Sequence, residues 1–420
     1  MIRGFFLLLL CVSMTAFTLA ESSTEESTQQ TTLTLKDGQY TGDVVNGLRH
    51  GYGTFRYKDG RVYQGEYFED KKHGTGKQSW PDGRLYEGDW KDDMRAGKAT
   101  FIDADGSQYV GDFKNDMKYG FGTYTLPDIY VYTGEWKQNA MHGKGTLIYN
   151  NGAKYEGDFV AGMKEGWGKY TDADGSTYEG NWKKDLRNGK GTSIDKQGSK
   201  YVGDFVDNFR EGYGELYGYD KVNYFGEWKR QVQQGKAKIT WPNGEEYEGD
   251  VVEGKREGTG KFKYASGETY EGTWKNDTRE GEGVTTYPDG RKYVGEYQDG
   301  KKSGYGVMTW NDGARYEGEW KNGVFWGEGV YVDSDNDKYE GQFIGGHRYG
   351  FGTYTWADGA KYEGEWAGGV QHGKGKLYET GDRFVEGYWQ NGEYVGQHIP
   401  ASEKMKHPDE RVSNLKIEEL

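Results

Sequence analysis

The sequence predicts an all-β fold, an elongated antiparallel β-hairpin meander that forms an open, twisted single sheet. Three observations predict it: a strict 23-residue repeat, glycines and aromatic rings at fixed repeat positions, and a turn signal near the end of most repeats. Hydrophobic residues make up only 33% of the chain, whereas aromatics make up 16% and glycines number 70. Such a composition favours a thin layer of rings packed on bare backbone over a thick aliphatic core.

The N-terminal segment, residues 1–20, is predicted to be a secretory signal peptide. Arg3 supplies its positive charge, residues 5–12 supply a short apolar run, and Ala20 precedes the expected cleavage site. We therefore expect a secreted protein or one in the lumen of the secretory pathway, with an uncleaved membrane anchor as the alternative. The only cysteine, Cys11, lies in this segment, so disulfides are not expected in the mature chain. Residues 21–37, rich in Glu, Ser, Thr and Gln, are predicted to be a disordered polar leader.

The repeat itself occupies residues 38–397, about fifteen and a half copies. Fifteen tyrosines follow one another at 23-residue steps from Tyr40 to Tyr362, and a degenerate copy starts at Val385. Glycine stands two and eleven residues after every one of these leading tyrosines, and a ring stands four residues after most of them. Glycine also stands thirteen residues after the tyrosine, except at Ala99 and Ala237. An uninterrupted period of this length is the signature of a repeat architecture.

The spacing within a repeat predicts two strands, because side chains two residues apart share one face of a strand. The leading tyrosine, the first glycine and the ring share a face of the first strand, and the later glycines share a face of the second. A ring can then lie across a neighbouring glycine, so these residues are predicted to be structural. The acids three residues after most of the tyrosines are expected to face water, and pairs such as Asp59-Gly60 predict tight reversals. The best copies of the structural pattern are Tyr316, Gly318, Trp320, Gly327 and Gly329, and Tyr362, Gly364, Trp366, Gly373 and Gly375.

The run Tyr-Glu-Gly-Glu-Trp at 316–320 and again at 362–366, followed by Gly-x-Gly at 373–375, resembles the MORN (membrane occupation and recognition nexus) repeat. The resemblance covers residues 40 to about 392. It implies an elongated hairpin array that serves as a scaffold, a partner-binding groove or a lipid-contact surface. Most proteins with this repeat are intracellular, and the predicted signal peptide departs from that habit.

Charge and motifs exclude several functions. The chain has 54 Lys and Arg against 68 Asp and Glu, a net charge of −14. This balance argues against nucleic-acid binding and disfavours an anionic membrane surface. No motif for catalysis or for a cofactor is present, and four histidines, His50, His73, His142 and His372, share one repeat position. Residues placed by repeat phase usually serve hairpin geometry, so we expect no enzyme activity and no cofactor.

Three smaller features carry site hypotheses. Asp333, Asp335 and Asp337 alternate as in a calcium loop, with a polar hairpin turn as the competing interpretation. Asn276 begins the sequon Asn-Asp-Thr and is predicted to be glycosylated. The charged tail, residues 398–420, is expected to contain a capping helix around residues 411–420. Its last four residues, 417–420, are a degenerate match to an endoplasmic-reticulum retention signal or simply an acidic helix end.

The sequence leaves three functions open. The favoured one is a non-enzymatic scaffold that binds a protein partner, or a second copy of itself, through an aromatic groove. The second is a peripheral protein that binds membrane lipid or glycan. The third is a regulatory array for an enzyme on another chain.

Overall fold

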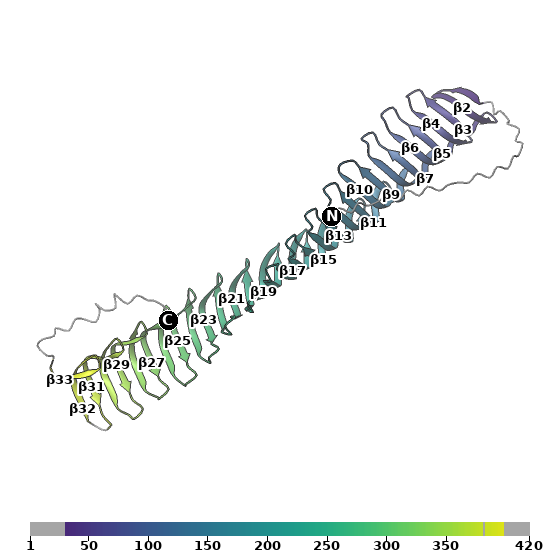
Figure 1. Cartoon of the computed structure of the whole chain (residues 1–420). Coiled ribbons are helices and arrows are strands. Elements are labelled where there is room, and N and C mark those ends of the chain that lie inside the picture. Colours follow the sequence, from purple (N-terminus) through teal and green to yellow (C-terminus); the bar gives the residue numbers. More distant parts are fainter. Residues whose placement is uncertain (1–29, 381–382, 399–420) are drawn as a thin grey trace, which may run out of the picture. The chain divides into compact units, whose positions relative to one another are not determined.

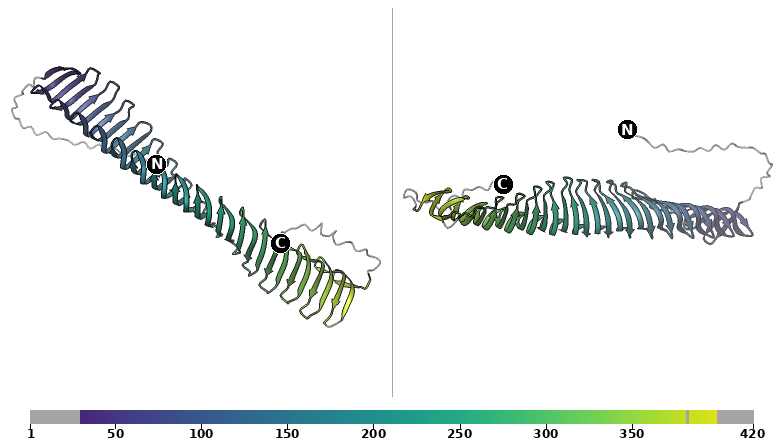
Figure 2. Two further views of the ribbon diagram at one scale, coloured as in Figure 1. Left: turned by 180° about the vertical axis from the view of Figure 1, so that it is seen from behind. Right: turned by 90° about the horizontal axis from the view of Figure 1, so that it is seen from below.

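The computed structural model describes residues 30–380 and 383–398. They form 33 strands in an open antiparallel hairpin meander, which confirms the predicted all-β fold (Figure 1). The chain divides into an N-terminal and a C-terminal unit, each a single layer of strands (Figure 2). Within the described ranges there is no helix with the length and apolarity needed to cross a membrane.

The N-terminal unit extends to Asp128 and also contains Trp136–Asn139. Each of its strands pairs antiparallel with the next, as β1 with β2 and β8 with β9. Its strands are β1 (Thr31–Leu35), β2 (Gly38–Val45), β3 (Leu48–Tyr57), β4 (Val62–Phe68), β5 (Lys71–Ser79), β6 (Leu85–Lys91), β7 (Met94–Ile102), β8 (Gln108–Lys114) and β9 (Met117–Leu126).

The C-terminal unit contains Ile129–Glu135 and the chain from Ala140 onward, so the boundary runs through β10 (Tyr130–Lys137). The direction of its strands rotates gradually along the unit, as expected of a twisted sheet (Figure 1). Its further strands are β11 (Ala140–Tyr149), β12 (Lys154–Val160), β13 (Met163–Thr171), β14 (Thr177–Lys183), β15 (Leu186–Ile194), β16 (Lys200–Val206), β17 (Phe209–Tyr217), β18 (Asn223–Lys229), β19 (Val232–Thr240), β20 (Glu246–Val252), β21 (Lys255–Lys263), β22 (Thr269–Lys275), β23 (Thr278–Thr286), β24 (Lys292–Gln298), β25 (Lys301–Thr309), β26 (Arg315–Lys321), β27 (Val324–Val332), β28 (Lys338–Ile344), β29 (His347–Thr355), β30 (Lys361–Ala367), β31 (Val370–Tyr378), β32 (Phe384–Gln390) and β33 (Glu393–Gly396).

Two kinds of turn join the strands. The turn inside a repeat has two residues with positive φ, for example Ala161 (50°) and Gly162 (87°), which is the type I′ geometry that matches the twist of a hairpin. The Gly162 amide donates to the Met141 carbonyl of the preceding repeat at 2.9 Å, so this turn also ties neighbouring repeats together. The turn between repeats contains the predicted Asp-Gly pairs, and Gly60 donates to the Tyr57 carbonyl at 3.1 Å.

The flanks differ in part from the prediction. Residues 21–37 were expected to be disordered, but Thr31–Leu35 forms β1, which pairs with β2 from Thr31↔Gly42 to Leu35↔Gly38. Alternating threonine and leucine suit this edge strand, because the exposed edge of the first hairpin offers free hydrogen-bonding groups. The predicted signal peptide, the C-terminal helix and the retention signal lie outside the described residues.

Candidate functional site

One face of the sheet carries the ring layer, defined as the leading tyrosines and the rings four residues after them. The repeat that starts at Tyr155 shows its geometry. Tyr155 is completely buried, and a Cβ on Gly168 would lie 2.5 Å from its ring. The Tyr155 ring makes edge contacts with Phe159 of its own repeat (centroid distance 5.1 Å) and with Trp182 of the next (5.3 Å). The layer is therefore a continuous series of edge-to-face pairs that rests on glycine.

The predicted structural residues occupy these positions. Tyr316 contacts Trp320 and Phe343 at 5.3 Å each, and Tyr362 contacts Trp366 at 5.3 Å and Trp389 at 5.1 Å. Both tyrosines are fully buried, so they offer no surface to a partner. The glycines that face these tyrosine rings are Gly318, Gly329, Gly364 and Gly375.

A β-bulge interrupts the hairpin formed by the two strands of a repeat, as in the repeats that start at Tyr155, Tyr178 and Tyr201. In the Tyr155 repeat, Gly157 pairs with Gly168, but Asp158 pairs with Glu165, so extra residues of β13 loop out. At the bulge, the Tyr155 hydroxyl donates to the Asp158 carbonyl at 3.1 Å. Each of the fifteen leading tyrosines makes this bond, at 2.7–3.2 Å. Burial raises the pKa of Tyr155, which keeps the hydroxyl neutral and able to donate.

The glycine eleven residues after each tyrosine, the bulge glycine, has a role that the period-two argument did not predict. Gly166 has φ of 64° and lies within the bulge, not beneath a ring. The acid opposite it is not simply a solvated residue, because Asp158 Oδ2 accepts a hydrogen bond from the Trp167 amide at 3.2 Å. Gly327 and Gly373 occupy the same position, with φ of 61° and 70°.

A column of cations covers the ring layer, and the sequence analysis missed it. Because of the bulge, Lys164 pairs with Phe159, so its side chain lies on the ring face. Its Nζ lies 5.4 Å from the centroid of Tyr155 and 5.1 Å from that of Trp182, within the range of cation–π attraction. The sequence signal is Arg or Lys two residues before the bulge glycine in eleven of fifteen repeats. The column comprises Arg49, Lys72, Arg95, Lys118, Lys164, Arg187, Arg210, Arg256, Arg279, Lys302 and Arg348.

The opposite face carries the exposed rings. They follow the bulge glycine directly and keep 50–62% of their surface accessible: Tyr52, Phe121, Trp167, Tyr213, Tyr305 and Phe351. We call this set the outer ring column. From Phe121 onward its members recur every second repeat except at Thr259, a 46-residue period in the sequence that could have revealed them. Charged residues occupy the intervening repeats, lysine at 144, 190 and 236 and glutamate at 282 and 328, and Lys144, for example, forms an ion pair with Asp158 at 2.7 Å.

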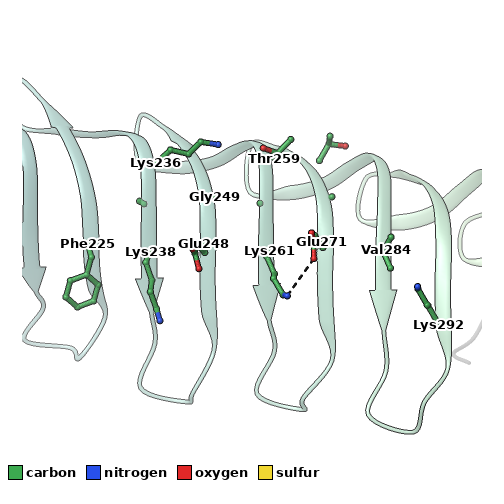
Figure 3. A pocket seen from close by; sticks show the side chains of 14 residues that line it. Phe225, Lys236, Lys238, Glu248, Gly249, Thr259, Lys261, Glu271, Val284 and Lys292 are labelled. Atoms are coloured by element: carbon green, nitrogen blue, oxygen red, sulfur yellow. Dashed lines mark ion pairs between the residues drawn. The ribbon is translucent and has the colours of Figure 1, made fainter.

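The column has a gap at Thr259, and there the outer face is hollowed. The hollow has a volume of about 1090 Å³ and extends from Phe225 to Lys292. Figure 3 shows its charged side chains on successive strands, with Lys261 reaching Glu271 at 3.7 Å. It is therefore a polar interruption in an otherwise aromatic column.

Asp333, Asp335 and Asp337, the predicted calcium ligands, lie in a hydrogen-bonded turn. Asp333 Oδ1 accepts hydrogen bonds from the amides of Asp335 (3.0 Å) and Asp337 (2.9 Å). Asp337 Oδ2 accepts from the Tyr354 hydroxyl at 2.7 Å, so its carboxylate connects two hairpins. These bonds supply a structural reason for the three aspartates. Across residues 30–380 and 383–398, no group of three His, Cys, Asp or Glu is arranged to hold a metal ion.

Asn276, the predicted glycosylation site, lies in the exposed two-residue turn between β22 and β23, with φ of 48°. The backbone amide of Asn276 donates a hydrogen bond to Glu257 Oε2 at 2.8 Å. Of the histidines that share a repeat position, His50 packs against Phe68 at 5.1 Å, which agrees with a role in hairpin packing.

Comparison with known proteins gives one family match. The MORN repeat profile matches residues 40–60, 63–83, 86–108, 109–128, 132–154, 155–177, 178–200, 201–221, 224–246, 247–269, 270–290, 293–315, 316–338, 339–361 and 362–383. No curated protein sequence matched the chain.

Among solved structures, the chain is similar to the TCP domain of SAS-4 from Drosophila melanogaster, solved with a proline-rich motif of Ana2. That likeness has 14% identity, covers 41% of this chain and 81% of that chain, and has a TM-score of 0.22. The G-box domain of the microcephaly protein CPAP is similar at 13% identity over 59% of this chain and 100% of that chain, with a TM-score of 0.21. The TCP10 domain of Danio rerio CPAP with a STIL peptide is similar at 13% identity over 64% and 98%, with a TM-score of 0.17.

Proposed function

Because the chain belongs to the MORN repeat family, in which the hairpin array itself is the functional unit, we propose that it is a non-enzymatic scaffold that binds a protein partner through its outer ring column. This binding surface lies on the face opposite the ring layer. The leading tyrosines are buried and hydrogen-bonded, so they cannot serve as an open groove.

The observation that carries the proposal is the accessibility of the outer ring column. Trp167 and Tyr213 expose 50% and 56% of their surface and stand two repeats apart. Strands are spaced at about 4.8 Å, so successive rings lie roughly 19 Å apart along the sheet. Large aromatic side chains are the residues that most often anchor protein interfaces, and an exposed series of them marks an interaction surface. Intervening charged residues such as Lys190 supply a polar rim.

The test removes three rings together, with the variant Trp167→Ser, Tyr213→Ser and Phe351→Ser. All three side chains point away from the ring layer, so the fold should persist, as circular dichroism would show. We expect the variant to lose partners that the wild-type chain captures from secretory-pathway extracts. The matched control replaces Lys144, Lys190 and Lys236, which occupy the same repeat position, with serine. Equal capture by the ring variant and the wild type would refute the proposal.

Two other occupants of the column are outcomes of the same experiment. Sedimentation with anionic vesicles in the absence of calcium, lost in the ring variant, would assign the rings to a membrane instead. A change from dimer to monomer in light scattering would assign them to a second copy of the chain.

The proposed location is the secretory pathway. The apolar run in residues 5–12 and the exposed Asn276 sequon support it. Mass spectrometry of the mature protein should find an N-terminus at Glu21 and a glycan on Asn276 that is lost in Asn276→Gln. A mature N-terminus at Met1 together with an unmodified Asn276 would contradict this location.

A further inference from the structure

Most arginines of the cation column have an internal counter-ion. Arg256 Nε lies 3.1 Å from Asp277 Oδ1, and Asp277 belongs to the two-residue turn of the next repeat. Arg49 with Asp70 and Arg95 with Asp116 repeat this arrangement at 3.2 and 3.1 Å. The turn aspartate also accepts a hydrogen bond from the backbone amide of its arginine; the distance from Arg256 N to Asp277 Oδ1 is 2.9 Å. The repeat thus contains a built-in device that neutralises a partly buried guanidinium.

The turn aspartate is absent after Arg279, which pairs with Glu268 instead, after the isolated Arg348, and in two successive repeats. The turn residue that would pair with Arg187 is Asn208, and the one that would pair with Arg210 is Gln231. The side-chain oxygens of Asn208 and Gln231 accept hydrogen bonds from the backbone amides of Arg187 and Arg210, at 2.9 and 3.0 Å. These side chains carry no negative charge. Among the described residues, neither guanidinium forms an ion pair. Arg210 lies over Tyr201 and Trp228, with centroid distances of 4.8 and 5.0 Å.

The two guanidiniums are also partly removed from water. Burial lowers the pKa of both Arg187 and Arg210, which means that their surroundings disfavour the charge. A desolvated cation without a counter-ion costs free energy that an incoming anion can recover.

A hollow lies beside them. It has a volume of about 460 Å³ and is lined by Arg187, Arg210, Asp172, Ser193 and Asp195, among others. It exists because small or acidic residues replace the rings of other repeats: Ser193 stands where Phe262 stands later, and Asp195 where Tyr264 stands. This volume is in the range of small-ligand pockets.

The carboxylates in the hollow form no ion pair with Arg187 or Arg210, although the charge of Asp195 acts on Arg210. Asp195 Oδ1 accepts the amides of Gln197 and Ser199, each at 2.9 Å, and Asp172 Oδ1 accepts the Ala173 amide at 2.7 Å. One oxygen of each carboxylate therefore serves its own turn. The second oxygens can accept from hydroxyl groups.

We propose that this hollow is a binding site for an oxyanion, a carboxylate or sulfate group held between Arg187 and Arg210. Arginine forks suit such groups because two parallel N–H donors match two oxygens. The anion is either free in solution or carried by an acidic sugar, whose hydroxyls would face Asp172 and Asp195. The site is on the face opposite the outer ring column, so it is independent of the proposed protein interface.

The first measurement is calorimetric titration of the full chain with sodium glucuronate, sodium sulfate and glucose. We expect saturable binding of glucuronate, weaker binding of sulfate because two carboxylates are near, and none of glucose. Sulfate binding as tight as glucuronate binding would identify a site for the free ion. Failure of both anions to bind at concentrations up to about 10 mM, where even a weak site would fill, would overturn the proposal.

The second measurement uses variants that keep or improve the fold. Asn208→Asp supplies the counter-ion that Asp277 gives Arg256, and Ser193→Phe fills the hollow with a ring found at that position in other repeats. Each should reduce affinity at least about tenfold, without lowering the melting temperature. Arg187→Gln with Arg210→Gln should abolish binding, whereas Arg256→Gln, in the same column, should leave it unchanged. Unchanged affinity in both Asn208→Asp and Ser193→Phe would refute the site.

Discussion

Replacement of the bulge glycine Gly258 by alanine tests the physical account of the hairpin most directly. Gly258 has φ of 62°, and an added Cβ would lie 2.9 Å from Asp250 Oδ2. That oxygen accepts the Thr259 amide and hydroxyl, both at 2.9 Å. The substitution therefore forces a left-handed backbone on alanine and pushes against the carboxylate that closes the bulge.

The magnitude follows from two contributions. A left-handed conformation costs a non-glycine residue about 1–2 kcal/mol. Displacement of Asp250 weakens two hydrogen bonds to a charged acceptor, for roughly another 1–2 kcal/mol at this solvent-accessible position. We expect Gly258→Ala to lower the free energy of local opening by about 2–4 kcal/mol. Gly258→Val should lower it further, because a β-branched side chain is more restricted there.

The assay is hydrogen exchange of the amides in β20 and β21, because each repeat contacts mainly its neighbours and opens locally. Gly254→Ala is the matched control: Gly254 also has positive φ, 78°, but its Cβ would meet only Gln233 Oε1 at 3.4 Å. It carries the backbone strain without the carboxylate contact. The variant Asp250→Ala with Gly258→Ala should show coupling between the two sites. Equal losses in the free energy of local opening in Gly258→Ala and Gly254→Ala would refute the proposed role of Asp250.

Three further predictions concern the ring face. Tyr247→Phe should lower the free energy of local opening by about 1–3 kcal/mol, because the Asp250 carbonyl loses its 2.7 Å donor. Tyr213→Phe on the outer face should be nearly neutral. Hydrogen exchange compares the two variants, and similar losses of stability would contradict the role of the Tyr247 hydroxyl. Burial lowers the pKa of Lys302 to about 8 from 10.5, so the folded state loses its proton first and stability should rise between pH 8 and about 10.5. Lys302→Met should remove this rise and stabilise the repeat by about 1–2 kcal/mol at pH 7; a rise that persisted in the variant would exclude Lys302 as its source. Burial raises the pKa of Tyr178 and Tyr201 to about 12 from 10.0. These tyrosines therefore ionise first in the unfolded chain above pH 10, and the free energy of unfolding should fall between pH 10 and 12. A rise in tyrosinate absorbance well before the circular dichroism changes would contradict the burial of these hydroxyls.

Much of the fold could be predicted from the sequence because its signals are local and periodic. The step from Tyr155 to Tyr178 sets the hairpin length, and glycines such as Gly157 and Gly168 mark where a ring can lie on backbone. These relations involve residues close in the chain or one repeat away, so spacing alone reveals them. The repeat family and the all-β topology follow from the same pattern.

The binding surfaces depended on a feature that spacing does not reveal. The bulge after Gly157 loops out two residues of β13, Gly166 and Trp167, so that Lys164 pairs with Phe159 and lies against the rings of two repeats. Alternation alone places Lys164 and Trp167 on opposite faces, but it does not give the pairing of Lys164 with Phe159, because a bulge adds residues to one strand only. Which arginines lack a counter-ion likewise required the distances between repeats, since an ion pair between Arg256 and Asp277 joins side chains that 21 positions separate. The sequence alone thus determined the repeat, its strands and its ring-on-glycine packing, and the tertiary structure decided which side chains are buried, exposed or unpaired, because those properties depend on the pairing across the bulge and on the distances between successive repeats.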